Sequence, residues 1–278
     1  MSNKGKTVVI TGGGGTLCGP IAIGLAKQGC KVVLVGRRLD ILEKRAEEVR
    51  EVGAECLCFS ADVTDEARMQ EVHDEINRKF GKVSILVNGA GGNQMDVVAS
   101  VNEYQKGELE PGHDFKGWFD LKMDRFLDVV NVNVMGTVIP SHVFSRDMVE
   151  LGGGSILNFA SMNTYRPLSR VPAYAASKAA VSNFTQWLAA YLAPAGVRVN
   201  AVAPGFFWNE RTPKLMLKPD GSLTERAEHI IYHTPMHRWG QAEDLYGCAE
   251  WLLDDEKAAF VTGITVPVDG GFLSNAGL

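Results

Sequence analysis

Apolar strand-like runs alternate with amphipathic helical stretches along the whole sequence, and this alternation restricts the fold more than any other feature. The stretch 39–53, for example, repeats apolar residues at helical spacing (Leu39, Leu42, Ala46, Val49). Strands that are apolar almost throughout belong to sheets buried on both faces, and right-handed helical crossovers make neighbouring strands parallel. The pattern predicts an α/β fold, a Rossmann-type doubly wound parallel sheet of about seven strands flanked by helices, in a single domain, 1–278. The strand runs are TVVITG (7–12), KVVLVG (31–36), ECLCFSADV (55–63), SILVNGAG (84–91), GSILNFAS (154–161), RVNAVAPG (198–205) and GITVPVDGG (263–271).

Two long segments interrupt this alternation, 93–124 after the fourth strand run and 206–240 after the sixth. Connections of this length in compact domains are usually lids or binding loops. Ligands of open α/β sheets bind beyond the carboxyl ends of the strands, which is where both segments begin. We therefore expect the two segments to build a substrate pocket.

Charge and hydropathy narrow the choice of partners. The 278-residue chain has a formal net charge of −5, which argues against non-specific binding to nucleic acid, because such binding needs a basic face. We expect no membrane span, since no run of about eighteen apolar residues occurs, and the first residues do not read as a secretory signal. Five cysteines without a second Cys-x-Cys pair favour packing over zinc binding. A cytoplasmic protein with reduced thiols is the expectation.

Glycines cluster between the first strand run and the first helical stretch, in TGGGGTLCGP (11–20). A strand–glycine–helix junction offers free backbone N–H groups and the positive end of a helix dipole, which are the physical requirements for binding a pyrophosphate. Glycines also let a ligand approach the main chain closely. A tight turn would use the same residues, but the position directly after the first strand favours a dinucleotide site.

Tyr174 and Lys178 lie four residues apart within a helical pattern, so both side chains point the same way. A phenol with a pKa of about 10 is a poor acid or base at neutral pH, and a nearby ammonium lowers that pKa. Ser161 ends the fifth strand run, and Asn133 stands in VVNVNVMGT. Two surface residues would show the same spacing as Tyr174 and Lys178, but the presence of Ser161 and Asn133 favours a catalytic set.

Together these motifs resemble the short-chain dehydrogenase/reductase family over essentially the whole chain. The resemblance rests on TG (11–12), DVTD (62–65), NGAG (88–91), Asn133, Ser161, Tyr174 with Lys178, RVNAVAPG (198–205) and PVDGG (267–271). It implies an NAD(P)-dependent oxidoreductase acting on CH–OH groups, in which Tyr174 transfers a proton and Ser161 stabilises charge on the substrate oxygen. By the same resemblance, Lys178 would hold the nicotinamide ribose, and Asn133 would hold a water that links Lys178 to solvent.

The resemblance also implies which residues meet the dinucleotide. The residues at 62–63 would contact the adenine, those at 88–91 the adenosine ribose and pyrophosphate, and those at 204–205 the nicotinamide. The full set is Gly12, Gly14, Gly15, Thr16, Leu17, Arg37, Arg38, Asp62, Val63, Asn88, Ala90, Gly91, Tyr174, Lys178, Pro204, Gly205, Phe207 and Asn209.

Several positions depart from the family pattern. Family loops usually read T-G-x-x-x-G-x-G, and this chain has Thr16 and Cys18 at the two later glycines. Gly89 stands where a second Asn is common, and Asn209 where a Thr often meets the carboxamide. None of these departures removes a catalytic group.

The second strand run ends in Gly36, Arg37 and Arg38. Relatives that prefer NAD carry an acidic residue at this point, to accept hydrogen bonds from the adenosine ribose. A small residue followed by arginine suits a 2′-phosphate, because guanidinium is a rigid fork for phosphate oxygens. We favour NADP over NAD; if the arginines face only solvent, NAD remains the alternative.

The polar and cationic residues near the predicted site indicate a polar, anionic substrate. The candidate substrate contacts are Ser161, Asn163, Arg170 and Arg211, with Arg166 as a further cation. The runs SMNTYRPLSRVPAYAASKAAVSNFTQWLA (161–189) and APGFFWNERTPKLM (203–216), with the 93–124 segment, resemble the D-mannonate oxidoreductase (fructuronate reductase) branch of the family. That branch implies interconversion of D-fructuronate and D-mannonate, a ketone/alcohol step at C5.

Other functions stay open at this point. A gluconate 5-dehydrogenase-like enzyme, a 3-oxoacyl thioester reductase and a non-catalytic nucleotide-sensing scaffold are the alternatives. His229, His233 and His237 recur every four residues, but Thr234-Pro235 breaks the helix, so we expect no metal site. A homotetramer is expected, because family members commonly pair through the helices of Asn133 and Tyr174, and 183–193 is apolar on more than one side.

Overall fold

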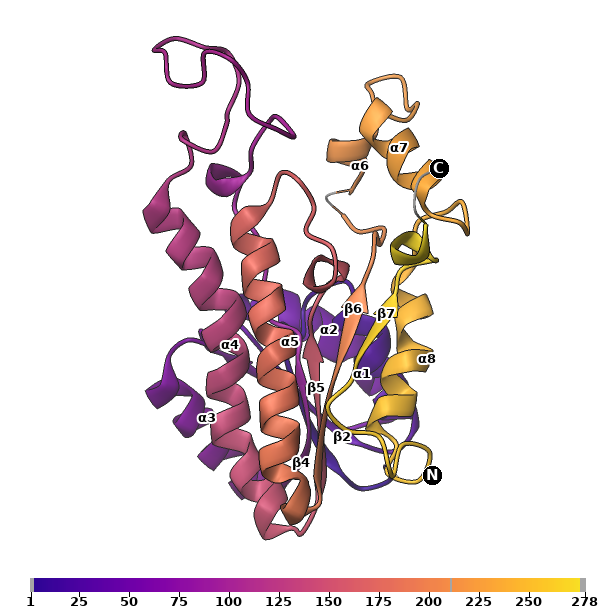
Figure 1. Cartoon of the computed structure of the whole chain (residues 1–278). Coiled ribbons are helices and arrows are strands. Elements are labelled where there is room, and N and C mark those ends of the chain that lie inside the picture. The colour runs from indigo at the N-terminus through magenta and orange to yellow at the C-terminus, as the bar shows by residue number, and fades with distance from the viewer. Residues whose placement is uncertain (1–2, 211, 276–278) are drawn as a thin grey trace.

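Seven parallel strands form one sheet in the order β3-β2-β1-β4-β5-β6-β7 (Figure 1). The structure, a computed structural model, describes residues 3–210 and 212–275. From the central β1 the chain winds outward to β3, returns beside β1 at β4, and then winds the other way to β7. The predicted doubly wound, Rossmann-type sheet is confirmed. The strands are β1 Thr7–Thr11, β2 Lys31–Gly36, β3 Cys56–Ser60, β4 Val83–Asn88, β5 Gly154–Phe159, β6 Val197–Pro204 and β7 Thr265–Val268.

Helices cover both faces of the sheet. Helices α1, α2 and α8 pack on one face, and α3, α4 and α5 on the other (Figure 1). Among the residues that the structure describes, no helix combines the length and the hydropathy needed to cross a bilayer. The helices are α1 Cys18–Lys27, α2 Leu39–Glu51, α3 Glu66–Lys79, α4 Met123–Glu150, α5 Pro172–Leu192, α6 Thr212–Met216, α7 Glu225–His233 and α8 Ala242–Leu253, with single 3₁₀ turns at Met95–Val97, Met162–Thr164, Ala193–Ala195 and Phe272–Ser274.

Alternate residues of β1 enter two separate apolar cores. Val8 and Ile10 pack with Leu25 of α1, whereas Val9 packs with Phe144 of α4 on the other face. All of these side chains are fully buried. Because helices close both faces of the sheet, a ligand can reach this strand only at its ends.

The predicted helix 39–53 forms α2, with one residue placed differently. Leu42, Ala46 and Val49 are buried, as the helical spacing predicts. Leu39 is 47% exposed, because it is the first residue of the helix and precedes the turns that pack on the sheet.

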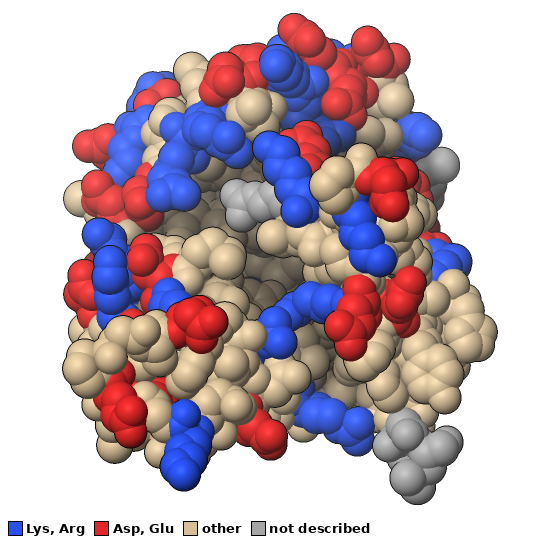
Figure 2. Space-filling model, turned by 90° about the horizontal axis from the view of Figure 1, so that it is seen from above, with Lys and Arg blue, Asp and Glu red and all other residues tan. Residues whose placement is uncertain are grey.

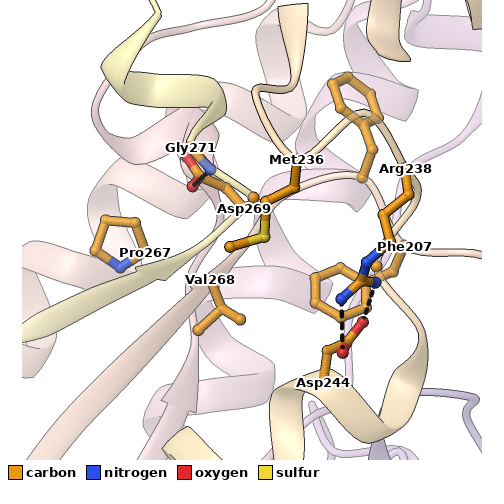
Figure 3. A pocket seen from close by; sticks show the side chains of 11 residues that line it. Phe207, Met236, Arg238, Asp244, Pro267, Val268, Asp269 and Gly271 are labelled. Atoms are coloured by element: carbon orange, nitrogen blue, oxygen red, sulfur yellow. Dashed lines mark hydrogen bonds and ion pairs between the residues drawn. The ribbon is translucent and has the colours of Figure 1, made fainter.

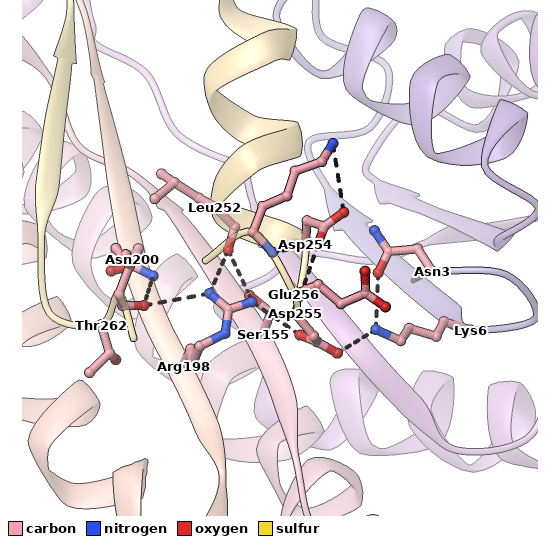
Figure 4. Close-up of polar contacts among 12 residues, drawn as sticks. Asn3, Lys6, Ser155, Arg198, Asn200, Leu252, Asp254, Asp255, Glu256 and Thr262 are labelled. Atoms are coloured by element: carbon pink, nitrogen blue, oxygen red, sulfur yellow. Dashed lines mark hydrogen bonds and ion pairs between the residues drawn. The ribbon is translucent and has the colours of Figure 1, made fainter. Parts of the chain in front are cut away.

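A polar cluster holds the amino-terminal ends of the strands together (Figure 4). Arg198 of β6 donates hydrogen bonds to the backbone oxygen of Leu252 at 2.8 Å and to Asp255 at 3.1 Å. The other oxygen of Asp255 accepts from Lys6, just before β1. This end of the sheet is therefore closed by structural contacts, and the opposite end remains for a site.

The two long segments stand above the carboxyl ends of the strands, as predicted. Figure 1 shows the connection between β4 and α4 rising on one side, and α6 and α7 on the other. The first connection folds on itself around Glu108, whose buried carboxylate accepts from the backbone N–H groups of Gln105 and Phe119. Seen from above, the surface is hollowed between the two sides, and lysine and arginine side chains lie around the opening (Figure 2).

Candidate active site

Ser161, Tyr174 and Lys178 line one cavity of about 420 Å³ at the carboxyl ends of β5 and β6. Ser161 directly precedes the 3₁₀ turn after β5, and its hydroxyl accepts from the backbone N–H of Asn163. Tyr174 lies in the first turn of α5, which begins with Pro172, and Lys178 follows one turn later. The helix and the strand end thus bring the three predicted groups together. Leu17, Asn163, Pro204, Gly205, Phe207 and Asn209 line the same cavity.

Lys178 is buried without an acidic partner. Its side chain is 4% exposed, and its ammonium donates to the backbone oxygen of Phe159 at 2.6 Å. The ammonium lies 5.7 Å from the centre of the Tyr174 ring. Burial lowers the pKa of Lys178 from its ordinary value of 10.5 to about 8, because the charged form has lost its hydration.

The pKa of Tyr174 differs from the sequence prediction. An acidified phenol is expected from the nearby ammonium, but burial raises the pKa of Tyr174 above its ordinary value. A hydrogen bond with Ser161 opposes this effect and is smaller. The prediction fails because desolvation of a phenolate outweighs the contact with Ser161. In the protein alone, Tyr174 is a protonated phenol at neutral pH.

Asn133 holds the backbone that follows β4. It is fully buried in α4; its side-chain oxygen accepts from the N–H of Gly92 at 2.9 Å, and its amide donates to the carbonyl of Gly92 at 2.8 Å. A β-carbon at position 91 would lie 2.4 Å from the Asn133 side-chain oxygen and 3.4 Å from the ammonium of Lys178. Only glycine fits at position 91, and the main chain there passes directly beside the ammonium of Lys178.

A second cavity, of about 290 Å³, lies between the glycine loop and the ends of β2 and β3. Half of the residues predicted to bind the dinucleotide line it: Gly12, Gly14, Gly15, Arg37, Arg38, Asp62, Val63, Ala90 and Gly91. A β-carbon on Gly12 would lie 2.7 Å from the carbonyl oxygen of Gly89, and one on Gly14 would lie 2.7 Å from Ile41. Packing of the loop therefore requires glycine at both positions, and the loop lines the cavity with main chain, which fits a nucleotide diphosphate.

Two departures from the family pattern compensate for each other. Cys18 stands at the last glycine of the family loop, and Gly89 stands at the second Asn. A β-carbon at position 89 would lie 2.3 Å from the sulfur of Cys18. The thiol is 3% exposed and fills the space that a side chain at 89 would need. Cys18 and Gly89 thus pack against each other and stabilise the conformation of the glycine loop.

Not every predicted residue reaches a cavity. Thr16 lines neither of the two described above. Asn88 is 1% exposed, and its amide donates to Ser141 at 2.9 Å and to Asn158 at 2.8 Å, so this side chain ties β4 to α4 and β5. Arg211 lies outside the described residues. Arg170 lines a third, adjoining cavity, and Arg166 lines none of the three.

The structure adds residues that the motifs do not single out. Leu168 and Val171 line the cavity of Tyr174, and Val132 lines the glycine cavity. The sequence offers one indication of these residues: Leu168 and Val171 lie between Ser161 and Tyr174, and Val132 directly precedes Asn133. Leu168 is held in place by a hydrogen bond from its N–H to Asn163 at 2.9 Å.

Phe207 also lines a further cavity (Figure 3). It has a volume of about 390 Å³ and is lined by Met236, Val268 and the Arg238–Asp244 ion pair. None of the four predicted catalytic residues lines it, so we assign the chemistry to the cavity of Tyr174.

Metal chemistry finds no support in the part of the chain that the structure describes. No group of three His, Cys, Asp or Glu residues there is arranged to hold a metal ion. Helix α7 ends at His233, so His237 lies beyond it. The five cysteines are free thiols.

Comparison with known proteins agrees with this geometry. The model of the short chain dehydrogenase family matches residues 6–216. The chain belongs to the short-chain dehydrogenase/reductase family. As a member of the family, it is an NAD(P)-dependent oxidoreductase that acts on CH–OH groups. The predicted enzyme is confirmed, against the alternative of a nucleotide-sensing scaffold.

Three relatives of this dehydrogenase cover nearly its whole length. It is 41% identical to the uncharacterized oxidoreductase UxuB of Bacillus subtilis, over 99% of this chain and 97% of that protein. It is 34% identical to the 2-dehydro-3-deoxy-D-gluconate 5-dehydrogenase of Dickeya dadantii, over 98% and 96%. A crystal structure of a candidate D-mannonate oxidoreductase from Haemophilus influenza, with bound NAD, is 37% identical over 99% and 97%, with a TM-score of 0.94.

The buried ammonium of Lys178 predicts a pH-dependent stability. Below pH 8 the folded protein carries a buried charge; between pH 8 and 10.5 the unfolded chain keeps this proton and the folded chain does not, so the free energy of unfolding should rise with pH. The expected gain from pH 8 to 9.5 is about 2 kcal/mol, at about 1.4 kcal/mol per unit. Urea unfolding of the nucleotide-free protein and of Lys178→Met measures it. Equal pH dependence in both proteins would contradict this account.

Proposed function

We propose that this dehydrogenase interconverts a ketone and a secondary alcohol on a sugar acid, with D-fructuronate and D-mannonate as the pair. The observation that carries the proposal is the placement of Ser161, Tyr174 and Lys178 in one cavity that adjoins another lined by arginine. One substrate could place its carbonyl oxygen beside Ser161 and Tyr174 in the first cavity and its anionic group beside arginine in the second. Likeness to a candidate D-mannonate oxidoreductase supports the same substrate.

When bound, the nicotinamide would supply the hydride that reduces the carbonyl carbon, or would accept it in oxidation. Tyr174 donates its hydroxyl proton to the substrate oxygen during reduction and takes it back in oxidation. The raised pKa of Tyr174 keeps the phenol protonated, which suits the reductive direction at neutral pH. Ser161 donates a hydrogen bond to the same oxygen as negative charge develops on it.

Lys178 and Asn133 support the proton transfer by Tyr174. The Lys178 ammonium favours the Tyr174 phenolate that forms when the proton leaves, and it would hold the nicotinamide ribose hydroxyls. Asn133 fixes the main chain at Gly92 by two hydrogen bonds, beside Lys178. A water held by Asn133 would return a proton to Lys178.

The cavity-lining residues supply the nucleotide contacts in this proposal. The glycine loop would hold the diphosphate, and Asp62 and Val63 the adenine, with Ala90 and Gly91 beside the adenosine ribose. Pro204, Gly205, Phe207 and Asn209 would border the nicotinamide, in the cavity that also holds Tyr174.

A gluconate 5-dehydrogenase-like activity is the second candidate. It is favoured by the 34% identity to a 2-dehydro-3-deoxy-D-gluconate 5-dehydrogenase, which also acts on a sugar acid by its name. A 3-oxoacyl thioester reductase fits less well, because its long acyl chain would meet the polar and cationic rim of the opening (Figure 2).

A substrate panel tests the proposed reaction. The purified protein should oxidise D-mannonate and reduce D-fructuronate with a higher kcat/KM than it shows for gluconate, 5-ketogluconate or acetoacetyl thioesters. The measurement follows nicotinamide absorbance with each cofactor. Preference for gluconate would transfer the proposal to the second candidate, and turnover of thioesters alone would contradict both.

The choice between the two nucleotides depends on the end of β2. Gly36, Arg37 and Arg38 line the glycine cavity, and the end of β2 offers no acidic residue to accept from the adenosine ribose, while the similar Haemophilus structure has NAD bound. Arg37 also lies close enough to Asp62 to help lower the pKa of that carboxyl, after the hydrogen bonds from Thr64. We propose that NADP is favoured and that NAD is also used, with Arg37 binding the 2′-phosphate.

Replacing Arg37 tests this preference. In the Arg37→Gln protein, the ratio of kcat/KM for NADPH over NADH should fall roughly 10- to 100-fold, the value of a hydrogen bond to a charged group. Arg78→Gln, an exposed arginine of α3, is the matched control and should leave the ratio unchanged. A wild-type protein that prefers NADH, or an Arg37→Gln ratio equal to that of the control, would overturn the assignment.

We also propose a homotetramer that pairs through α4 and α5. Trp187 and Tyr191 of α5 are 58% and 69% exposed, and their rings stack at 5.2 Å. Leu127 of α4 is 67% exposed. Burial of these side chains against a second copy would remove apolar surface from water. Sedimentation of the purified protein at tetramer mass would support this arrangement, and monomer mass would contradict it.

A further inference from the structure

A third cavity, of about 450 Å³, opens beside the one that holds Tyr174. The two share Leu168, Val171 and Phe206, so they are compartments of one hollow separated by apolar side chains. The 93–124 segment, the loop before α5 and α7 line the third cavity, together with Phe206 and Phe272. A molecule that places one end at Tyr174 can therefore place its other end among the side chains of α7.

Two arginines face this third cavity. Arg170, just before α5, is half-buried, and Arg226 lies in the first turn of α7 at the solvent side. Neither guanidinium forms an ion pair with any residue in 3–210 or 212–275. Arg170 donates to the side-chain oxygen of Asn102 at 2.7 Å. Because Asn102 is uncharged, this hydrogen bond does not neutralise the positive charge of Arg170.

The two guanidinium groups act on each other. Burial, and then the positive charge of Arg170, lower the pKa of Arg226, so each group is held near the other at a cost in free energy. Unpaired like charges at one cavity are relieved by an anion that binds between them. His229 and His233 also line the cavity and add positive charge when protonated, whereas Glu225 is the single carboxylate of the lining.

We infer that Arg170 and Arg226 together bind the carboxylate of the substrate, while the carbon that reacts lies between Ser161 and Tyr174. This inference rests on the proposed function and narrows it to acids whose carboxylate is several carbons away from the reacting carbon. A guanidinium pair gives bidentate contacts to a carboxylate and none to an uncharged alcohol at that end, so it selects acids over polyols.

The 93–124 segment has a defined part in this site. The side-chain oxygen of Asn102 accepts from Arg170 at 2.7 Å and from the hydroxyl of Ser169 at 3.1 Å. The backbone N–H of Ala99 donates to the carbonyl of Arg170 at 2.9 Å. Asn102 is therefore a positioning residue, because it fixes the direction of the Arg170 fork without reaching the reacting atoms.

The cation nearest in sequence does not share this site. Arg166 is exposed and donates to the backbone oxygen of Asn275 at 3.4 Å, and it does not line the cavity. Arg166→Gln therefore removes the same charge from the same loop without removing a proposed contact, and it serves as the matched control.

The test compares an acid with its uncharged counterpart. Arg170→Gln and Arg226→Gln should each raise KM for D-mannonate by roughly 10- to 100-fold, with a smaller change in kcat, because a hydrogen bond between charged groups is lost. Turnover of mannitol, which lacks the carboxylate, should change less than twofold. Asn102→Ala should raise KM for D-mannonate by less than Arg170→Gln does. Arg166→Gln should behave as the wild type.

Binding separates this inference from the proposed reaction. Calorimetric titration of D-mannonate into the protein saturated with NAD(H) measures affinity whether or not turnover follows. Binding that is weakened at least tenfold by Arg226→Gln, in a wild-type protein that does not oxidise D-mannonate, would support the carboxylate site and contradict the reaction. Equal KM and affinity in Arg226→Gln and Arg166→Gln, an equal loss on mannitol, or no binding of D-mannonate to the wild type would overturn the inference.

Discussion

The hydrogen bonds that Asn133 makes to the main chain of Gly92 hold the whole site together. Asn133 is fully buried in α4, and it accepts from and donates to the same backbone unit, so the chain beyond β4 cannot turn away. Its amide also donates to Ser177 of α5 at 3.1 Å, which fixes the helix of Tyr174 and Lys178 relative to β4. The main chain after β4 and the amino-terminal part of α5 are thereby positioned by one side chain. Unsatisfied amide groups in such a place would cost about 1–3 kcal/mol each.

Charge without a partner is the second constraint on the site. The Lys178 ammonium is buried on a backbone carbonyl, and two arginines approach each other where no described carboxylate pairs with them. A protein optimised for stability alone would pair or remove these charges. The presence of these unpaired charges near Tyr174 is explained if ligands supply the partners: nucleotide hydroxyls for Lys178, and an anionic substrate for the arginines. The partly buried phenol of Tyr174 is kept neutral by the same low-dielectric surroundings.

The sequence predicts the sheet well, and it predicts that Tyr174 and Lys178 lie together, because both depend on local spacing. Alternating apolar runs define the strands, and one helical turn brings Tyr174 and Lys178 to one face. Side-chain direction is harder to predict: Asn88 belongs to the NGAG motif that predicts a dinucleotide contact, yet it points into the core, toward Asn158. The effect of burial on a pKa is harder still to predict. The direction of the Tyr174 pKa shift depends on how far the side chain is buried, which the spacing of residues in the sequence does not show. The sequence does not single out Arg226 for the proposed carboxylate site, because α7 and the loop before α5 meet only in three dimensions.

The most direct measurement of the central claim is steady-state turnover of the Tyr174→Phe protein, combined with its affinity for the nucleotide. Removing one hydroxyl from a ring that otherwise stays in place should lower kcat roughly 10²- to 10⁴-fold, while the Kd for NAD(H) or NADP(H) stays within about twofold. Tyr165→Phe, whose exposed side chain bonds only to the backbone of Thr265, is the control and should keep full turnover. Turnover by Tyr174→Phe close to that of the control would show that the proton is transferred elsewhere, and the account of this site would be wrong.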